Sequence, residues 1–161
     1  MGVLRNLRRP AWLLAVLVVV AGPAAATCAS DRLDIRGDWG KAQFSVELAL
    51  TPEEQARGLM FREEMRRMAG MLFVYDAMRP LGFWMRNTLI PLDMIFVDDT
   101  GVVLKVHAEA KPLDETVILS EDPALSVLEI NGGMAATLGI GPGDEIRSPA
   151  MPQDRAVWPC E

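Results

Sequence analysis

Short apolar segments separated by turn-forming residues recur along this chain, and they limit the folds that it can adopt. Residues 44–50 alternate large apolar side chains with small or polar ones, which is typical of a half-buried strand. Residues 71–75 and 94–97 are apolar runs that indicate buried strands, and further strands are expected at residues 102–107 and 124–130. Many short strands without strand–helix alternation predict a mainly antiparallel sheet that curls into a barrel-like form.

Two short helices are expected between these strands. Thr51 precedes Pro52, and Glu54 lies three residues after Thr51, which is the capping-box pattern of a helix start. Asn131 can cap a second helix that ends at Gly139. The predicted fold class is therefore α+β, a single small domain with a mainly antiparallel, β-barrel-like sheet and two short helices. The sequence has no glycine-rich phosphate loop, which disfavours a nucleotide-binding doubly wound fold.

Residues 1–26 have the organisation of a secretory signal peptide. An arginine-containing start is followed by an apolar stretch at residues 11–21 and by three alanines at residues 24–26, the order that signal peptidase requires. The apolar stretch is shorter than the roughly 20 residues that a membrane-spanning helix needs. We predict cleavage after Ala26, a periplasmic mature chain of residues 27–161 and no transmembrane span after cleavage. Retention of the segment as an N-terminal anchor is the alternative.

Cleavage of this segment would make the chain more acidic. The full chain has a formal net charge of −6 at pH 7, and loss of the three N-terminal arginines with no acidic residue lowers it to −9. Such a chain repels nucleic-acid phosphates and anionic lipid surfaces. We therefore expect no nucleic-acid binding, whereas the acidic charge suits a basic protein partner.

The two cysteines of the chain, Cys28 and Cys160, lie at the two ends of the predicted mature protein. In an oxidising compartment an even number of cysteines favours a disulfide. The chain-entropy model credits a loop of this length with at most about 5 kcal/mol. Lipidation of Cys28 as the first residue of a lipoprotein is the alternative. Residues 25–27 match a lipoprotein signal poorly, however, and lipidation would leave Cys160 as a single thiol.

Five sequence runs carry a resemblance to a known family. They are RGLM at 57–60, GMLFV at 70–74, FWMRNTLIPLD at 83–93, VLE at 127–129 and GPGD at 141–144. Together they resemble the bacterial and archaeal family called domain of unknown function 192, also known as uncharacterised protein family 0127. The resemblance implies a small α+β domain built on a barrel-like sheet, often behind an N-terminal signal or membrane segment, and it implies no catalytic residues.

The resemblance also suggests how the chain is divided. We expect a signal peptide at residues 1–26, an extended N-terminal segment at 27–41, the family domain at 42–147 and a C-terminal tail at 148–161.

The run within residues 83–93 is the first candidate for a site. A Trp ring offers a stacking face, and Asn and Thr side chains offer directional hydrogen bonds, so the run suits a small polar ligand. The leading hypothesis is an exported ligand-binding or accessory domain for a small polar ligand or a periplasmic protein partner. Alternatively, Asn87 and Thr88 stabilise a turn and Trp84 fills the core. The candidate ligand-binding residues are Trp84, Met85, Arg86, Asn87, Thr88 and Asp93.

Asp93 and Glu129 are weak candidates for catalysis. Each adjoins an apolar strand, where a carboxyl group is costly to bury unless it is paired or solvated. If the two side chains converge, they would support a hydrolase-type enzyme, with or without a divalent cation. The alternative is that each stabilises a turn or pairs with an arginine such as Arg57 or Arg86.

The methionines support a second alternative, copper handling. Seven of the ten methionines lie between Met60 and Met94, and thioether ligands select Cu(I). Methionine is also a common gap-filler of protein cores, which explains the same enrichment without a metal. We expect no cofactor and no resident metal. A single histidine, His107, does not supply a zinc site, and no nucleophile-elbow motif surrounds any serine.

Overall fold

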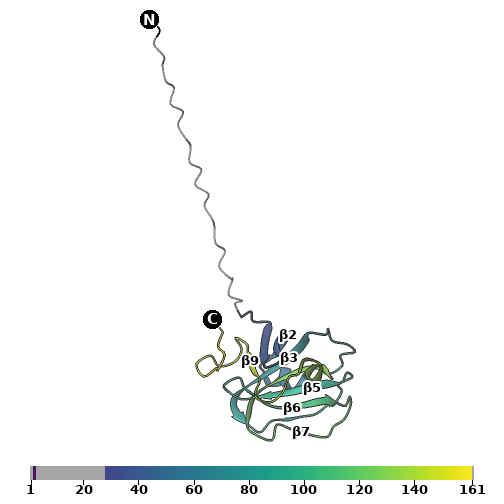
Figure 1. Ribbon diagram of the computed structural model, residues 1–161. Helices are drawn as coiled ribbons and strands as arrows, with labels where there is room; N and C mark the ends of the chain where they lie inside the picture. Colours follow the sequence, from purple (N-terminus) through teal and green to yellow (C-terminus); the bar gives the residue numbers. More distant parts are fainter. Residues whose placement is uncertain (1, 3–27, 161) are drawn as a thin grey trace.

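The computed structural model of the chain describes residue 2 and residues 28–160 (Figure 1). Apart from residue 2, the predicted signal peptide lies outside the described residues, so its cleavage stays a prediction. In chain order the elements are β1 (Arg32–Gly37), β2 (Gly40–Ala49), α1 (Pro52–Arg57), β3 (Ala69–Arg79), β4 (Gly82–Phe83), β5 (Leu92–Val97), β6 (Val103–Ala110), β7 (Ile118–Leu119), β8 (Ala124–Asn131), α2 (Met134–Leu138) and β9 (Glu145–Arg147).

Seven strands form one curled sheet in the order β6-β5-β8-β3-β2-β1-β9, and β4 pairs with β7 in a separate two-stranded sheet. Neighbouring strands are antiparallel except β2 and β3, which are parallel and are joined through α1. The two edges of the large sheet approach each other, because Val102 bridges to Glu145 and the Val103 amide donates to the Asp144 carbonyl over 2.8 Å. The sheet is therefore a curled half-barrel.

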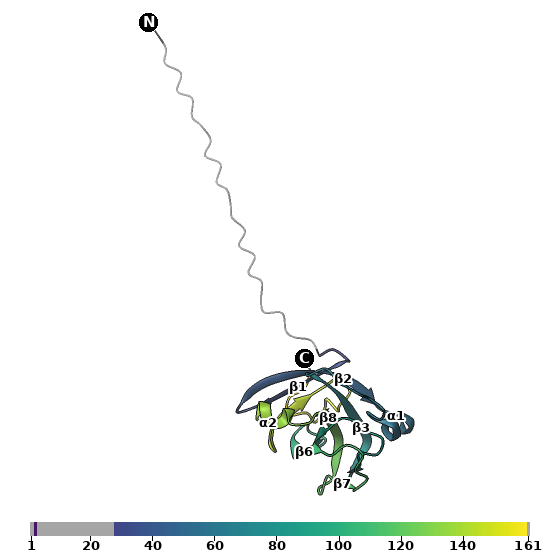
Figure 2. The same cartoon turned by 90° about the vertical axis from the view of Figure 1, so that its right-hand side faces the viewer.

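The predicted single domain, barrel-like sheet and two short helices are confirmed. The chain is mostly β, however, so the α+β class describes it only loosely. The predicted strands became β2, β3, β5, β6 and β8, and the segment predicted to be extended contains β1. Figure 2 shows α1 and α2 at opposite sides of the sheet.

Alternation along the strands divides the core into two clusters. In β3, Leu72 belongs to one cluster and Phe73 to the other; in β8, Leu128 and Val127 are divided in the same way. Successive side chains of a strand point to opposite faces, so the two clusters lie on opposite faces of the sheet. The first contains residues from both edge regions and fills the inside of the curl. The second covers the outer face, where β4 and the segment before β5 pack on the sheet.

Of the two N-terminal helix caps predicted from the sequence, one is confirmed and the other is wrong. At α1 the capping box is confirmed: Thr51 Oγ1 accepts from the Glu54 amide over 3.3 Å, and Glu54 Oε2 accepts from the Thr51 amide over 2.9 Å. At α2 the predicted cap was wrong, because Gly133 occupies the cap position and has no side chain to accept a bond. Asn131 instead donates to the Arg66 carbonyl over 2.9 Å. Within the described residues, neither helix has the length and apolar character to cross a membrane.

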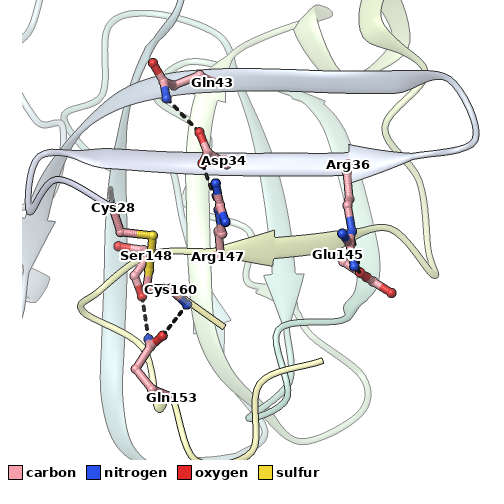
Figure 3. Close-up of polar contacts among 9 residues, drawn as sticks. All are labelled: Cys28, Asp34, Arg36, Gln43, Glu145, Arg147, Ser148, Gln153 and Cys160. Carbon is pink, nitrogen blue, oxygen red and sulfur yellow. Dashed lines mark hydrogen bonds and ion pairs between the residues drawn. A yellow bond between two sulfur atoms is a disulfide. The ribbon is translucent and has the colours of Figure 1, made fainter. Parts of the chain in front are cut away.

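The two ends of the described chain are joined by the predicted disulfide between Cys28 and Cys160, with 5.6 Å between the Cα atoms (Figure 3). The Sγ atom of Cys28, to which a lipid would be attached, is therefore bonded to Cys160. Gln153 holds the C-terminal tail beside the disulfide, since it donates to the Ser148 carbonyl and accepts from the Cys160 amide. Trp158 stacks on the guanidinium groups of two neighbouring strands, so the tail packs against β1 and β9.

Candidate functional site

A pocket of about 360 Å³ opens on the outer face of the sheet, between the loop that follows α1 and the strand β4. This volume lies at the lower end of the range of small-molecule sites in proteins, about 300–1,000 Å³. Side chains from β3, β4, β8 and the run that follows β4 meet in its lining. They include Tyr75, Arg79, Phe83, Trp84, Thr88 and Glu129.

Glu129 is a buried acid in the middle of the sheet. Its direct neighbours across the two adjacent strands are Met71 of β3 and Met94 of β5, so apolar side chains flank it on both sides. Only 4% of its surface is exposed. Burial raises the pKa of Glu129 from 4.5 to about 8, because a charged carboxylate loses its hydration there. At neutral pH the carboxyl group therefore carries its proton.

Aromatic rings form the walls of the pocket. Phe73 and Phe83 meet edge to face, with 5.1 Å between their ring centroids. Trp84 is 45% exposed and borders the pocket, so the alternative that it fills the core was wrong. The pKa of Tyr75 is raised chiefly by burial, and the charge of Arg79 opposes this while that of Glu129 adds to it. Tyr75 therefore lies within the electrostatic reach of both groups.

Two guanidinium groups line the pocket, and a third lies beside it. Arg57 and Arg79 are part of the lining, and Arg86 lies over the Trp84 ring at 5.6 Å from the ring centroid. Arg79 likewise stacks over the Tyr75 ring at 4.8 Å. A guanidinium that stacks on a ring keeps its N–H donors in its own plane, so Arg79 and Arg86 can still bind a partner there.

The run from Trp84 to Thr88 also organises the surrounding loops. Met85 is fully buried; its amide donates to the Asp114 carbonyl over 2.8 Å, and its carbonyl accepts from the Leu113 amide over 3.1 Å. Asn87 adopts a left-handed conformation with φ of 54°, and its carbonyl accepts from the Phe61 amide over 2.8 Å. Met85 and Asn87 thus have structural roles, as the turn alternative expected for Asn87.

The predicted ligand-binding residues are consequently separated by the fold. Trp84 and Thr88 line the pocket with Glu129, and Arg86 borders it through its contact with Trp84. Asn87 lies next to the pocket and donates to the sulfur of Met60 over 3.9 Å. Asp93 lies on the opposite face of the sheet from Glu129 and is not part of the pocket lining.

Asp93 and Glu129 do not form a catalytic pair. Asp93 is opposite Ile130 in the β5–β8 ladder, one position from the Met94–Glu129 pair, so the two carboxyl groups leave opposite faces of the sheet. Nor does either acid form an ion pair with an arginine within residues 28–160.

Asp93 has a structural role that the turn alternative anticipated. Its Oδ1 accepts from the Glu109 amide over 2.8 Å and from the Gly133 amide over 2.9 Å, and its Oδ2 accepts from the Ala135 amide over 2.7 Å. Asp93 therefore supplies the cap that the start of α2 lacks locally.

Several methionines of the enriched segment contribute to the core. Met71, Met85 and Met94 are buried in the cluster on the outer face, and Met65 packs against it. Met60 borders the pocket, whereas Met78 is exposed. Copper handling stays a hypothesis. Among the described residues, no group of three or more His, Cys, Asp or Glu side chains is arranged to hold a metal ion.

Sequence reasoning missed Tyr75, Arg79 and Phe83 as members of the site. A signal for Tyr75 was present, because Met71, Phe73 and Tyr75 alternate along one strand and therefore share a face. Arg79 could not be found in this way, because the β3–β8 pairing shifts register between Val74 and Arg79. The change of register interrupts the period-two pattern that would place its side chain.

Comparison with known proteins identifies relatives without an assigned activity. Residues 34–148 match the model of the DUF192 family, described as "Uncharacterized ACR". A crystal structure of a protein of unknown function from Novosphingobium aromaticivorans DSM 12444 is similar to this chain, with 48% sequence identity and a TM-score of 0.71. The similarity covers 72% of this chain and 83% of that chain.

A second crystal structure, of a Sinorhizobium meliloti 1021 protein described as a candidate transcription regulator, is 37% identical with a TM-score of 0.72. This similarity covers 77% of this chain and 97% of that one. No curated protein matches the chain.

Proposed function

The chain belongs to the DUF192 family, and we propose that its pocket binds a small organic ligand, with Trp84 as a stacking surface and Glu129 as a hydrogen-bonding group. The observation that carries this proposal is the buried carboxyl group of Glu129. Within residues 28–160 its side chain has neither a hydrogen bond nor an ion pair, although it borders an open pocket. No fully buried side-chain oxygen among the described residues lacks a hydrogen-bond partner, so the carboxyl oxygens of this largely buried acid reach the open pocket. A bound ligand would replace water as the hydrogen-bond partner of this carboxyl group.

The pocket walls support the same proposal. Trp84 presents almost half of its surface to solvent beside Phe83 and Tyr75, and an exposed aromatic ring at a pocket mouth suits stacking on a flat molecule. The Thr88 side chain lies in the same lining and can donate or accept a hydrogen bond. Binding is favoured over catalysis because Asp93, the expected catalytic partner of Glu129, faces away from it.

The proposal can be tested by NMR with the mature chain and a library of small planar amides and acids. We expect some members to shift both the Trp84 indole signal and the Thr88 amide signal in a saturable way. In W84A these members should bind at least about tenfold more weakly, whereas W158A should leave their affinity unchanged because Trp158 stacks on arginines of β1 and β9. A library in which no compound shifts either signal would exclude a ligand pocket here.

We also propose that the mature chain acts in the periplasm. The Cys28–Cys160 disulfide supports this, because disulfides persist mainly in oxidising compartments. The mass of the protein recovered from the periplasm tests it. A chain that begins at Thr27 and lacks the pair of thiol hydrogens is expected; retention of residues 1–26, or an added lipid mass at Cys28, would contradict it.

A further inference from the structure

Arg57 and Arg79, which line the pocket, have no acidic partner within residues 28–160. Five ion pairs occur within residues 28–160, and their cations are Arg36, Arg62, Lys105, Arg147 and Arg155. Neither Arg57, Arg79 nor Arg86 belongs to any of them. The chain has more acidic than basic residues, so acidic partners are plentiful elsewhere. Two unpaired guanidinium groups, those of Arg57 and Arg79, therefore line one pocket, and Arg86 contacts Trp84 of the same lining.

The pocket contains little negative charge to balance these arginines. Glu129 is the one acidic residue of its lining, and it is neutral at neutral pH for the reason given above. Apolar walls with a low dielectric strengthen the attraction between the guanidinium groups and an anion. At neutral pH the pocket lining therefore contains two cationic side chains and no charged acid.

The shape of the cationic groups selects a kind of anion. Guanidinium is planar and binds carboxylates through paired N–H donors, and it stacks on aromatic faces as Arg79 does on Tyr75. Trp84 and Phe83 offer flat apolar surfaces in the same pocket lining. A neutral carboxylic acid such as Glu129 can donate its proton to a carboxylate oxygen in a short, charge-assisted hydrogen bond.

On these grounds, and resting on the function proposed above, we infer that the ligand is a flat organic acid. Its unsaturated or aromatic body lies against Trp84, and its carboxylate is held by Arg57 or Arg79 and by the protonated side chain of Glu129. The proposal names a carboxylate because its planar, two-oxygen geometry matches both the guanidinium fork and the acid.

Binding of such a ligand depends on the protonation of Glu129. The ionisable groups that line the pocket with this carboxyl are Tyr75 and Arg79 of β3 and Arg57 at the end of α1, while the β5 residue opposite it is Met94. Above pH 8 Glu129 loses its proton and repels a carboxylate. Affinity for the acid therefore falls above this pH.

The test uses two probes of nearly the same shape, the anion 2-naphthoate and the neutral 2-naphthamide, titrated by calorimetry into the mature chain. At pH 7 we expect 2-naphthoate to bind at least about tenfold more tightly than 2-naphthamide. R57M and R79M should remove most of this preference when combined. R155M loses the same charge at a pair with Asp99 away from the pocket, and it should keep the preference.

The pH profile supplies the second readout. Wild-type affinity for 2-naphthoate should fall by about tenfold or more between pH 7 and pH 9.5, and E129Q should bind without this fall. Equal or weaker binding of 2-naphthoate than of 2-naphthamide would overturn the organic-acid inference while leaving a ligand pocket in place. Binding of neither probe, with no shift of the Trp84 indole by any library member, would remove the proposed function as well. Loss of the preference in R155M would also overturn the inference, because the preference would then depend on the net charge of the chain and not on the arginines of the pocket.

Discussion

Glu129 and Asp93 lie on adjacent strands one position apart in register, and their side chains leave opposite faces of the sheet. The fold accommodates the two buried carboxyl groups differently. Asp93 accepts hydrogen bonds from three backbone amides. Glu129 lies among methionines beside a pocket and keeps its proton. One acid therefore stabilises the fold, whereas the other is available to a ligand.

The protonation of Glu129 makes stability depend on pH. Its pKa is 4.5 when exposed and about 8 in the fold, so the folded state binds the proton more tightly. The stability that this proton contributes is fully present below pH 4.5 and is lost as the pH rises through 8. Between these values the free energy of unfolding should fall by up to about 1.4 kcal/mol per pH unit.

Urea unfolding of the wild type and E129Q at pH 5, 7 and 9 measures this dependence. The wild type should lose stability relative to E129Q as the pH rises, since glutamine does not titrate. E53Q, at an exposed position of α1, should follow the wild type. Wild-type and E129Q profiles that stay parallel would show that Glu129 is ionised in the folded state at all three pH values.

Substitution of Asp93 should destabilise the fold and leave the pocket intact. D93A removes three hydrogen bonds and leaves the amides of Glu109, Gly133 and Ala135 without this acceptor; the bond to Ala135 is buried and the other two are partly buried. We expect a loss of about 3 kcal/mol or more in urea unfolding, and a smaller loss for D93N, which keeps one acceptor oxygen. D93N should bind 2-naphthoate like the wild type. Altered affinity with unchanged stability would instead connect Asp93 to the site.

The roles of these two acids also show where sequence reasoning reached its limit. Apolar periodicity predicted both flanking strands, because alternation is a local property of a chain. The register between strands β5 and β8 is not local, and a shift of one residue exchanges the faces of every side chain. Asp93 and Glu129 were therefore identified as acids that adjoin apolar strands, yet whether they converge could not be read from the sequence.

The helix caps illustrate the same difference. The Thr51–Glu54 capping box lies within four consecutive residues, so the sequence predicted it correctly. The cap of α2 comes from Asp93, 42 residues before Ala135. The parallel pairing of β2 with β3 also departs from the antiparallel expectation, because α1 carries the chain over to the next strand. Both features depend on contacts between residues that are distant in the sequence.

The disulfide should account for a large part of the stability. It joins residues separated by 132 positions, and closing so long a loop restricts the unfolded chain. C28S/C160S should lose about 2–5 kcal/mol of unfolding free energy. A reductant should destabilise the wild type by a similar amount and leave the double variant unchanged. Equal stability of the oxidised and reduced wild type would mean that packing of the tail, through Trp158, already holds the ends together.

Leu113 offers a prediction about strain in the loops around the site. Its φ is 64°, a left-handed conformation that costs an ordinary side chain about 1–2 kcal/mol but suits asparagine, and its side chain is 60% exposed. L113N should therefore raise the free energy of unfolding by about 1 kcal/mol. L89N is the matched control, because Leu89 is also exposed but has no positive φ. If urea unfolding finds L113N no more stable than L89N, the apolar contacts of Leu113 offset its backbone strain.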